Sequence, residues 1–255
     1  MIDAHIHLQD HRFDADREKL IRQAQQCGVE GFLCASAAPS DWQPVCDLAG
    51  RHANIRPFIG THPWHAPQHD AALLRKLLTE HPHAGVGEIG LDAFKTNPAQ
   101  ESAFIDQLII AAELKRPCVI HCVKSFDQMA AFLKRLKDLP PALMFHGYSG
   151  TIRQAEFLLH FNAYFSFSGS VLSAHKRKLQ AVLAALPEDR ILAETDAPDM
   201  KPAPNYCFSE TEKRNIPANL PFIIQGIAAI RKTDANSLKA VLRHNIERFC
   251  SSLKS

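Results

Sequence analysis

Seven imidazole and carboxylate side chains fall where short β-rich runs of this sequence end. They are His5, His7, His62, Glu88, His121, His146 and Asp196. Imidazole nitrogens and carboxylate oxygens are the ligands that zinc, manganese and related divalent ions take in proteins. Side chains from distant parts of a chain meet only where the fold gathers strand ends at one point. The pattern therefore predicts a metal site and constrains the fold at the same time.

The chemistry of these residues suggests two metal ions that share a bridging carboxylate. His5 and His7 lie two residues apart, so both imidazoles project from the same face of an extended strand. A pair of ions lowers the pKa of a bound water toward neutrality and stabilises both the attacking and the leaving oxygen. Asp196 is suited to orient that water or to accept its proton. We predict that one ion is held by His5, His7 and Asp196, the second by His121 and His146, and that Glu88 bridges both.

The remaining potential ligands are assigned to ordinary positions. Six histidines fall outside the strand ends and are predicted to be solvated or packed: His11, His52, His81, His160, His175 and His244. Cys122 follows His121 directly and should point to the opposite face of the strand, away from the metal site.

Short β-rich runs alternate with longer amphipathic runs along the sequence. The expected strands cover 1–5, 30–36, 55–61, 84–90, 117–121, 142–146, 163–168 and 190–195. The expected helices cover 14–27, 40–52, 69–81, 98–115, 125–138, 151–161 and 174–186, with two more near 218–232 and 235–250 after a long loop. Eight such units in 255 residues predict an α/β fold of the (β/α)8 TIM-barrel type, with residues 1–255 as one domain. An open doubly wound sheet is the alternative, but its Gly-rich phosphate fingerprint is missing.

Composition bounds the class of protein. The chain has 46% hydrophobic and 22% charged residues and a formal net charge of +2, which is typical of a globular protein and too small to indicate a nucleic-acid partner by itself. The seven cysteines form no CxxC pair, which favours a reducing compartment. No signal peptide or membrane-spanning run is recognised. We therefore expect a cytoplasmic protein without membrane contact, and a monomer, because the barrel needs no partner to close its core.

Six short motifs give the chain a resemblance to the TatD family of metal-dependent deoxyribonucleases, a branch of the amidohydrolase-like barrels. The motifs are DAHIHL (3–8), GTHPWH (60–65), GEIGLD (87–92), PCVIHC (117–122), FHGYSG (145–150) and ETDAP (194–198), and KRNIP (213–217) matches the last long loop. The resemblance implies that the six residues assigned above to the metals are the ligands of two divalent ions such as zinc, magnesium or manganese. It also implies phosphodiester hydrolysis, often as a 3′-to-5′ exonuclease on DNA.

The substrate contacts are less closely defined by this resemblance. The family usually has a histidine where Trp64 stands, Gly147-Tyr148 replaces a Cys-Phe pair, and the segment 199–212 is an atypical version of a loop that should border the substrate. We expect His62 to act beside the metals or to contact phosphate, without being a ligand. Lys213 and Arg214 are candidate phosphate contacts. The aromatic side chains that could stack on a base are Trp64, Phe94 and Tyr206.

Three functions remain in competition. The first is a metal-dependent phosphodiesterase that acts on DNA ends or on RNA ends. The second is an amidohydrolase-type hydrolase of C–N or C–O bonds in a small molecule. Many such barrels bridge their metals with a carboxylated lysine, so Glu88 at that position favours the nuclease. The third, a non-catalytic binding scaffold, is disfavoured because the expected ligand set is complete.

Overall fold

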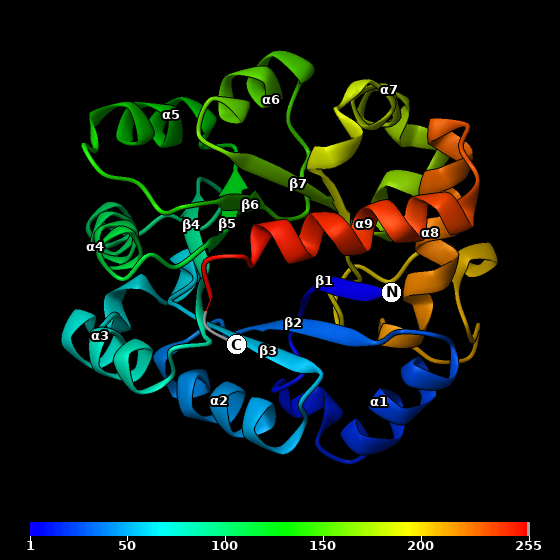
Figure 1. Ribbon diagram of the computed structural model, residues 1–255, viewed down its shortest axis with the longest axis horizontal. Helices are drawn as coiled ribbons and strands as arrows, with labels where there is room; N and C mark the ends of the chain where they lie inside the picture. The colour runs from blue at the N-terminus through cyan, green and yellow to red at the C-terminus, as the bar shows by residue number, and fades with distance from the viewer. Residues whose placement is uncertain (254–255) are drawn as a thin grey trace.

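The computed structural model describes residues 1–253, which form an eight-stranded parallel sheet rolled into a nearly closed barrel (Figure 1). The strands pair in chain order. Their bounds are β1 (Ile2–Ile6), β2 (Gly31–Ala35), β3 (Ile55–Ile59), β4 (Gly85–Asp92), β5 (Cys118–Val123), β6 (Leu143–Phe145), β7 (Ala163–Phe167) and β8 (Ile191–Ala193). The predicted (β/α)8 barrel is confirmed.

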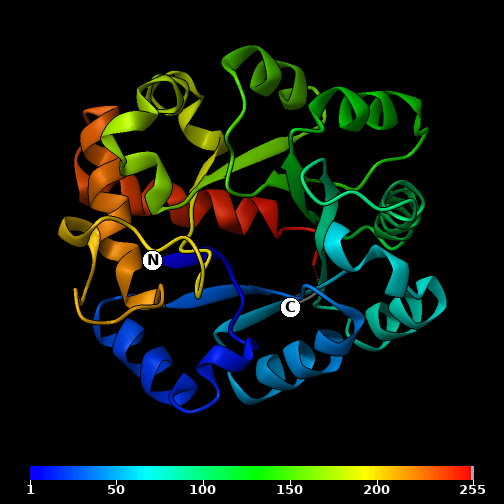
Figure 2. The same cartoon turned by 180° about the vertical axis from the view of Figure 1, so that it is seen from behind.

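A helix follows each strand and lies on the outside of the barrel (Figures 1 and 2). The helices are α1 (Arg17–Gln26), α2 (Trp42–Arg51), α3 (Ala71–Glu80), α4 (Gln100–Glu113), α5 (Phe126–Arg135), α6 (Ile152–Leu159), α7 (Arg177–Ala185), α8 (Leu220–Arg231) and α9 (Ala235–Phe249). Each falls within a predicted range and is shorter by a few residues, because several ends tighten into short 3-10 turns such as Pro39–Asp41 before α2. Among residues 1–253, no helix combines the length and apolarity needed to span a bilayer.

Every strand ends one or two residues away from its predicted end, and three of these shifts concern the candidate site directly. β4 continues two residues further, to Asp92, whereas β6 ends at Phe145 and β8 already at Ala193. His146 and Asp196 therefore follow their strands and lie on the loops that leave the barrel. Asp196 has φ of 58°, a left-handed conformation that breaks an extended strand and that Asp tolerates better than most residues.

The seam of the barrel lies between the first and the last strand. The His7 N–H donates to the Ala197 carbonyl at 2.9 Å, and the Asp196 N–H donates to the His5 carbonyl at 3.0 Å. Next to these bonds, the buried carboxylate of Asp3 accepts from both the backbone N–H and the hydroxyl of Thr195. The two ends of the sheet are thus joined by hydrogen bonds at the positions where the candidate ligands sit.

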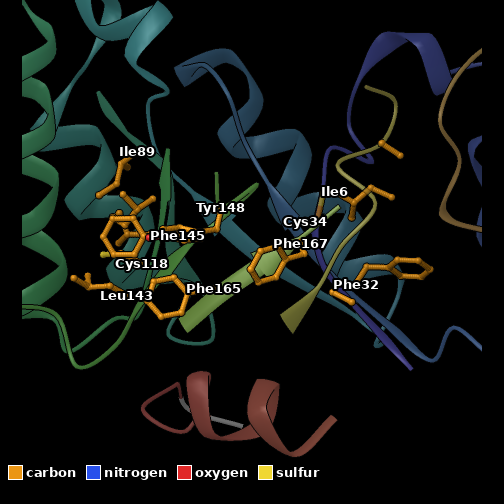
Figure 3. Packing of buried hydrophobic residues seen from close by; sticks show 14 of the residues in the cluster. Ile6, Phe32, Cys34, Ile89, Cys118, Leu143, Phe145, Tyr148, Phe165 and Phe167 are labelled. Carbon is orange, nitrogen blue, oxygen red and sulfur yellow. The ribbon is translucent and has the colours of Figure 1, made fainter. Parts of the chain in front are cut away.

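The hydrophobic core has an outer and an inner part. The larger cluster fills the space between strands and surrounding helices, where aromatic residues such as Phe145, Phe165 and Phe167 pack together (Figure 3). The smaller cluster includes Phe58 of β3 and Tyr164 of β7, and both rings contact Phe249 of α9. Because β3 and β7 lie on opposite sides of the barrel, a residue that touches both must close one end.

That closed end is the N-terminal end of the strands, since Ile2 packs against the same cluster. Figure 1 shows α9 crossing in front of the strands, and Figure 2 shows the molecule from the other side. The opposite opening is the one toward which the strands point. In parallel barrels that end carries the functional groups.

Candidate metal centre

All six residues predicted as ligands meet at the C-terminal end of the strands. His5 and His7 come from β1 and the residue after it, Glu88 from β4 and His121 from β5, while His146 and Asp196 follow β6 and β8. Their potential ligand atoms form overlapping groups: His5, His7 and Asp196; His5, Glu88 and His146; and His62, Glu88 and His121, with the atoms of each group within 4.8 Å of one another. Every group is buried or half-buried.

The first set of side chains is spaced as ligands around an ion. Glu88 Oε2 lies 3.4 Å from His5 Nε2 and 3.5 Å from His7 Nε2. Asp196 Oδ1 lies 3.6 Å and 3.7 Å from the same two nitrogens. These distances exceed those of good hydrogen bonds. They are close to the separation of about 3.4 Å between two ligands that bind one tetrahedral zinc ion at about 2.1 Å.

The second set faces the other oxygen of the same carboxylate. Glu88 Oε1 lies 2.6 Å from His146 Nε2 and 2.8 Å from His121 Nδ1, both within hydrogen-bond range. One carboxylate therefore presents each of its oxygens to a different pair of imidazoles. This is the arrangement that a carboxylate bridge between two ions requires.

The local backbone brings these strands unusually close. Gly90 has φ of 153°, and a Cβ atom there would lie 1.9 Å from the carbonyl oxygen of His121. Only glycine fits this approach, because any side chain would overlap the β5 backbone. The close approach places His121 beside Glu88, since both residues lie on these two paired strands.

The electrostatics of the cluster favour a cation. Burial alone would raise the pKa of Glu88, but the neighbouring His146, His62 and His121 outweigh it and hold the pKa well below its usual range. Burial lowers the pKa of His146, yet Glu88 and Glu194 outweigh it and raise the pKa well above the ordinary value. Asp196 has a strongly raised pKa, mainly because of burial. Protons on His146 and Asp196 thus offset the negative charge of the buried carboxylates, and a divalent ion can supply the same positive charge.

Unpaired nitrogens also fit a metal. Neither ring nitrogen of His5 has a hydrogen-bond partner within the described residues, although the side chain is fully buried. Nδ1 of His146 is also without one. Buried polar atoms are nearly always satisfied, so such atoms call for an explanation. Together with a donor set of imidazoles and carboxylates, they show that these residues fit divalent ions.

Two hydrogen bonds behind the cluster orient its imidazoles. His7 Nδ1 lies 2.8 Å from the carbonyl oxygen of Ala35, which leaves Nε2 free to face Glu88. His121 Nε2 lies 3.1 Å from Asp92 Oδ2, so that Nδ1 faces Glu88. Partners of this kind fix the tautomer and the ring orientation of metal-binding histidines.

Glu194 supports the cluster from behind His146. Its side chain is fully buried, accepts from the Gly147 N–H at 2.7 Å and from the Ser166 hydroxyl, and lies 3.8 Å from His146 Nδ1. No role was predicted for Asp92, the last residue of the motif GEIGLD, or for Glu194, the first residue of the motif ETDAP. Their position in those motifs, each close to a ligand, was the only signal available.

His62 lies inside the cluster, where its Nε2 is 3.4 Å from Glu88 Oε1 and 3.2 Å from His121 Nδ1. By distance alone it could be a ligand. However, its Nδ1 accepts a hydrogen bond from the Trp64 N–H at 3.2 Å. Burial lowers the pKa of His62 to about 3, so the ring is neutral near pH 7. A neutral ring that accepts at Nδ1 carries its proton on Nε2, which makes His62 a hydrogen-bond donor toward the centre.

Trp64 and Phe94 lie on two loops beside the centre. The Trp64 indole N–H donates to Asp92 Oδ2 at 2.8 Å, its ring contacts His62 edge-on, and Lys95 Nζ lies 4.7 Å from the ring centroid. Trp64 is 47% exposed and Phe94 78% exposed. Both rings are therefore accessible to a ligand near the metal residues.

Lys213 and Arg214 are not brought into contact with the cluster within residues 1–253. The guanidinium of Arg214 forms ion pairs of 2.7 Å with Asp16 and 2.9 Å with Glu212. It is therefore available to a phosphate only if these pairs break. Lys213 is exposed and lines a separate cavity of about 620 Å³ together with Arg214 and Lys19.

Comparisons with known proteins agree with this geometry. Residues 2–251 match the family described as TatD related DNase. A 3′-5′ ssDNA/RNA exonuclease TatD of Erwinia tasmaniensis is 32% identical over 98% of this chain and 99% of its own length, and the one of Musicola paradisiaca is 33% identical over 98% and 97%. Among solved structures, a TatD homologue of Escherichia coli K-12 superimposes with a TM-score of 0.89 at 27% identity over 98% and 97% of the two chains. The chain therefore belongs to the family of TatD-related DNases, as its motifs predicted.

Proposed function

We propose that this protein is a metal-dependent phosphodiesterase that shortens single-stranded DNA or RNA from the 3′ end. The proposal is carried by the geometry of Glu88, because its two carboxylate oxygens face two separate sets of imidazoles. The names of the curated relatives support the nucleic-acid substrate and the direction of cleavage. The rival amidohydrolase reading is weaker, since a glutamate stands at the bridging position.

Two divalent ions, of zinc, magnesium or manganese, would complete the site. His5, His7 and Asp196 would hold one, His121 and His146 the other, with Glu88 shared between them. When bound, such ions activate a water molecule and stabilise negative charge on the phosphoryl group. The number and identity of the ions belong to this proposal.

The residues of the chain divide the remaining work. Asp196, which is 16% exposed at its side chain, accepts the proton of the attacking water. His62 donates its Nε2–H to a phosphate oxygen that is not displaced, where a fixed donor stabilises the charge that develops. Trp64 holds His62 and Asp92 in place and presents its exposed ring to the terminal base.

The test is cleavage of a 5′-labelled single-stranded oligodeoxynucleotide with magnesium or manganese. We expect stepwise shortening from the 3′ end that EDTA abolishes and that Glu88→Ala reduces by at least about 1000-fold, because removal of a bridge disturbs both ions. Glu80→Ala, an exposed glutamate of α3, is the matched control and should keep full activity. Folded, metal-loaded protein that leaves both DNA and RNA intact would contradict the proposal. Small molecules with hydrolysable C–N or C–O bonds would then be the substrates to test.

We also propose that the protein acts in the cytoplasm as a monomer. All seven cysteines are free thiols, as expected in a reducing compartment. The barrel closes its own core with α9, so no second subunit is needed for that purpose.

A further inference from the structure

Two cavities meet beside the metal centre. The first has a volume of about 710 Å³ and is lined by His146, Phe94 and Lys124, among others. The second, of about 1090 Å³, lies between α6 and α7, which are neighbours on the outside of the barrel in Figure 1. Ser149–Thr151 line both cavities. A continuous depression thus leads from a candidate ligand to the outer surface.

The outer cavity carries a strong positive charge. The basic run, which we define as His175–Lys178, consists of four consecutive side chains that are all exposed and all line this cavity. No aspartate or glutamate lines it. Within residues 1–253, Lys176, Arg177 and Lys178 have no carboxylate within ion-pair distance, in contrast to Arg214. A ligand with several negative charges would be attracted here.

Local folding does not account for this charge. Lys176 is the N-cap of α7, and Arg177 and Lys178 are its first two residues. The N-terminal end of a helix carries a partial positive charge, so cations at these positions are repelled and oppose helix formation. The basic run therefore stands where it disfavours the helix, which indicates a role outside folding.

The apolar part of the depression fits the bases of a nucleic acid. Ile152 of α6 and Leu179 and Val182 of α7 line the outer cavity together with the basic run, and Phe94 is exposed in the inner one. Cations beside apolar and aromatic surface are the combination that binds single strands, because phosphates contact the cations and bases stack on the rings. A simple inorganic polyanion would use only the charged half.

We propose that the strand on the 5′ side of the scissile phosphate runs from His146 across Ser149–Thr151 into the α6–α7 groove, where the basic run binds its phosphates. This inference rests on the proposed function, since it assumes a single-stranded nucleic acid. It adds a second binding region that lies outside the metal centre. The enzyme should consequently prefer strands long enough to reach the groove.

The test compares a dinucleotide with a single strand of about 12 nucleotides, a length within the range of known single-strand sites. The variant is Lys176→Gln/Arg177→Gln/Lys178→Gln. Its matched control is Lys134→Gln/Arg135→Gln/Lys137→Gln, which removes the same charge from exposed positions around the C-terminal end of α5. We measure the ratio of kcat/KM for the long strand to kcat/KM for the dinucleotide.

The expected ratio falls by about 10- to 100-fold in the groove variant, because three phosphate contacts at 0.1 M salt supply at most about 100-fold in affinity. The slope of log kcat/KM against log salt should become shallower by about 2, at about 0.7 for each lost contact. The control should keep both the ratio and the slope. An unchanged ratio in the groove variant, or an equal fall in the control, would overturn the inference.

A binding measurement separates this inference from the proposed function. If the wild type cleaves neither substrate, the proposed function fails, but fluorescence anisotropy of the labelled strand in EDTA still tests the groove. Weaker binding by the groove variant than by the control would support the inference. Binding of phosphatidylserine vesicles, without binding of the strand, would assign the basic run to a membrane surface and overturn it.

Discussion

Replacement of Asp92 by asparagine should weaken one of the two proposed metal sites. Asp92 accepts three hydrogen bonds: Oδ1 from the Phe94 N–H at 2.8 Å, and Oδ2 from the Trp64 indole at 2.8 Å and from His121 Nε2 at 3.1 Å. Burial would raise its pKa, but these donors outweigh that effect and lower it. Asp92 is therefore an ionised group that only accepts.

Asparagine cannot reproduce this pattern. Its amide has one accepting oxygen and one donating nitrogen, so in either orientation the nitrogen faces an N–H group. If the nitrogen replaces Oδ2, it faces both Trp64 and His121, and the imidazole is no longer held with Nδ1 toward Glu88. If it replaces Oδ1, it faces the Phe94 N–H and disturbs the loop instead. Removal of such a partner typically lowers metal affinity by about 10- to 100-fold, which is about 1.4–2.8 kcal/mol.

Calorimetric titration with manganese or zinc is the assay for Asp92→Asn. We expect one binding event to weaken by that amount, and the event that involves His5, His7 and Asp196 to change less. Asp127→Asn, an exposed aspartate of α5, serves as the control for the loss of charge. Unchanged affinity for both ions, in a variant that unfolds at the wild-type temperature, would refute the assignment of Asp92 as the residue that orients His121.

Three further predictions concern stability and protonation. Trp42→Ala should lower the free energy of unfolding by about 3–5 kcal/mol in urea titrations, because the side chain is fully buried; a loss below about 1 kcal/mol would contradict this. Arg214→Gln should destabilise the protein above pH 4.5 and progressively less as pH falls toward 2, since the hydrogen bond from Arg214 lowers the pKa of Glu212 to about 2; a difference that does not vary with pH would argue against the pair. Metal binding should release protons near pH 7 and tighten as pH rises, because Glu88 helps raise the pKa of His146; equal calorimetric heats in buffers of different ionisation enthalpy would disprove it.

The positions of most elements could be predicted because the hydrophobic pattern repeats with each strand and helix. Apolar residues of the strands are buried on both faces, and polar residues such as His121 mark the last part of a strand, where burial decreases. The ligands could be predicted because imidazoles and carboxylates that recur near the ends of several strands form an unusual pattern. The limits of β8 were less predictable, because the left-handed backbone of Asp196 depends on contacts with β1.

The partners of charged groups could not be predicted from the sequence. Arg214 and Asp16 are 198 residues apart in the chain, so nothing local indicates that they form an ion pair. The same holds for Asp92. Its role in orienting His121 depends on its hydrogen bonds with the Trp64 indole and the Phe94 N–H, which only the folded chain brings together. The sequence shows that a charged side chain is present, whereas the folded structure determines whether that side chain is already engaged in an ion pair.

The location of the barrel seam has a consequence for how the chain behaves as a polymer. His5 and His7 stand on one side of the seam and Asp196 on the other. An ion held by these three residues would tie the first strand to the last and enclose residues 5–196, about three quarters of the chain, in one loop. Such a closure removes much of the freedom of the unfolded chain, as a long-range cross-link does. It also implies that a growing polypeptide has no complete site until its last strand has been synthesised and docked, so catalytic competence would begin only with the finished barrel.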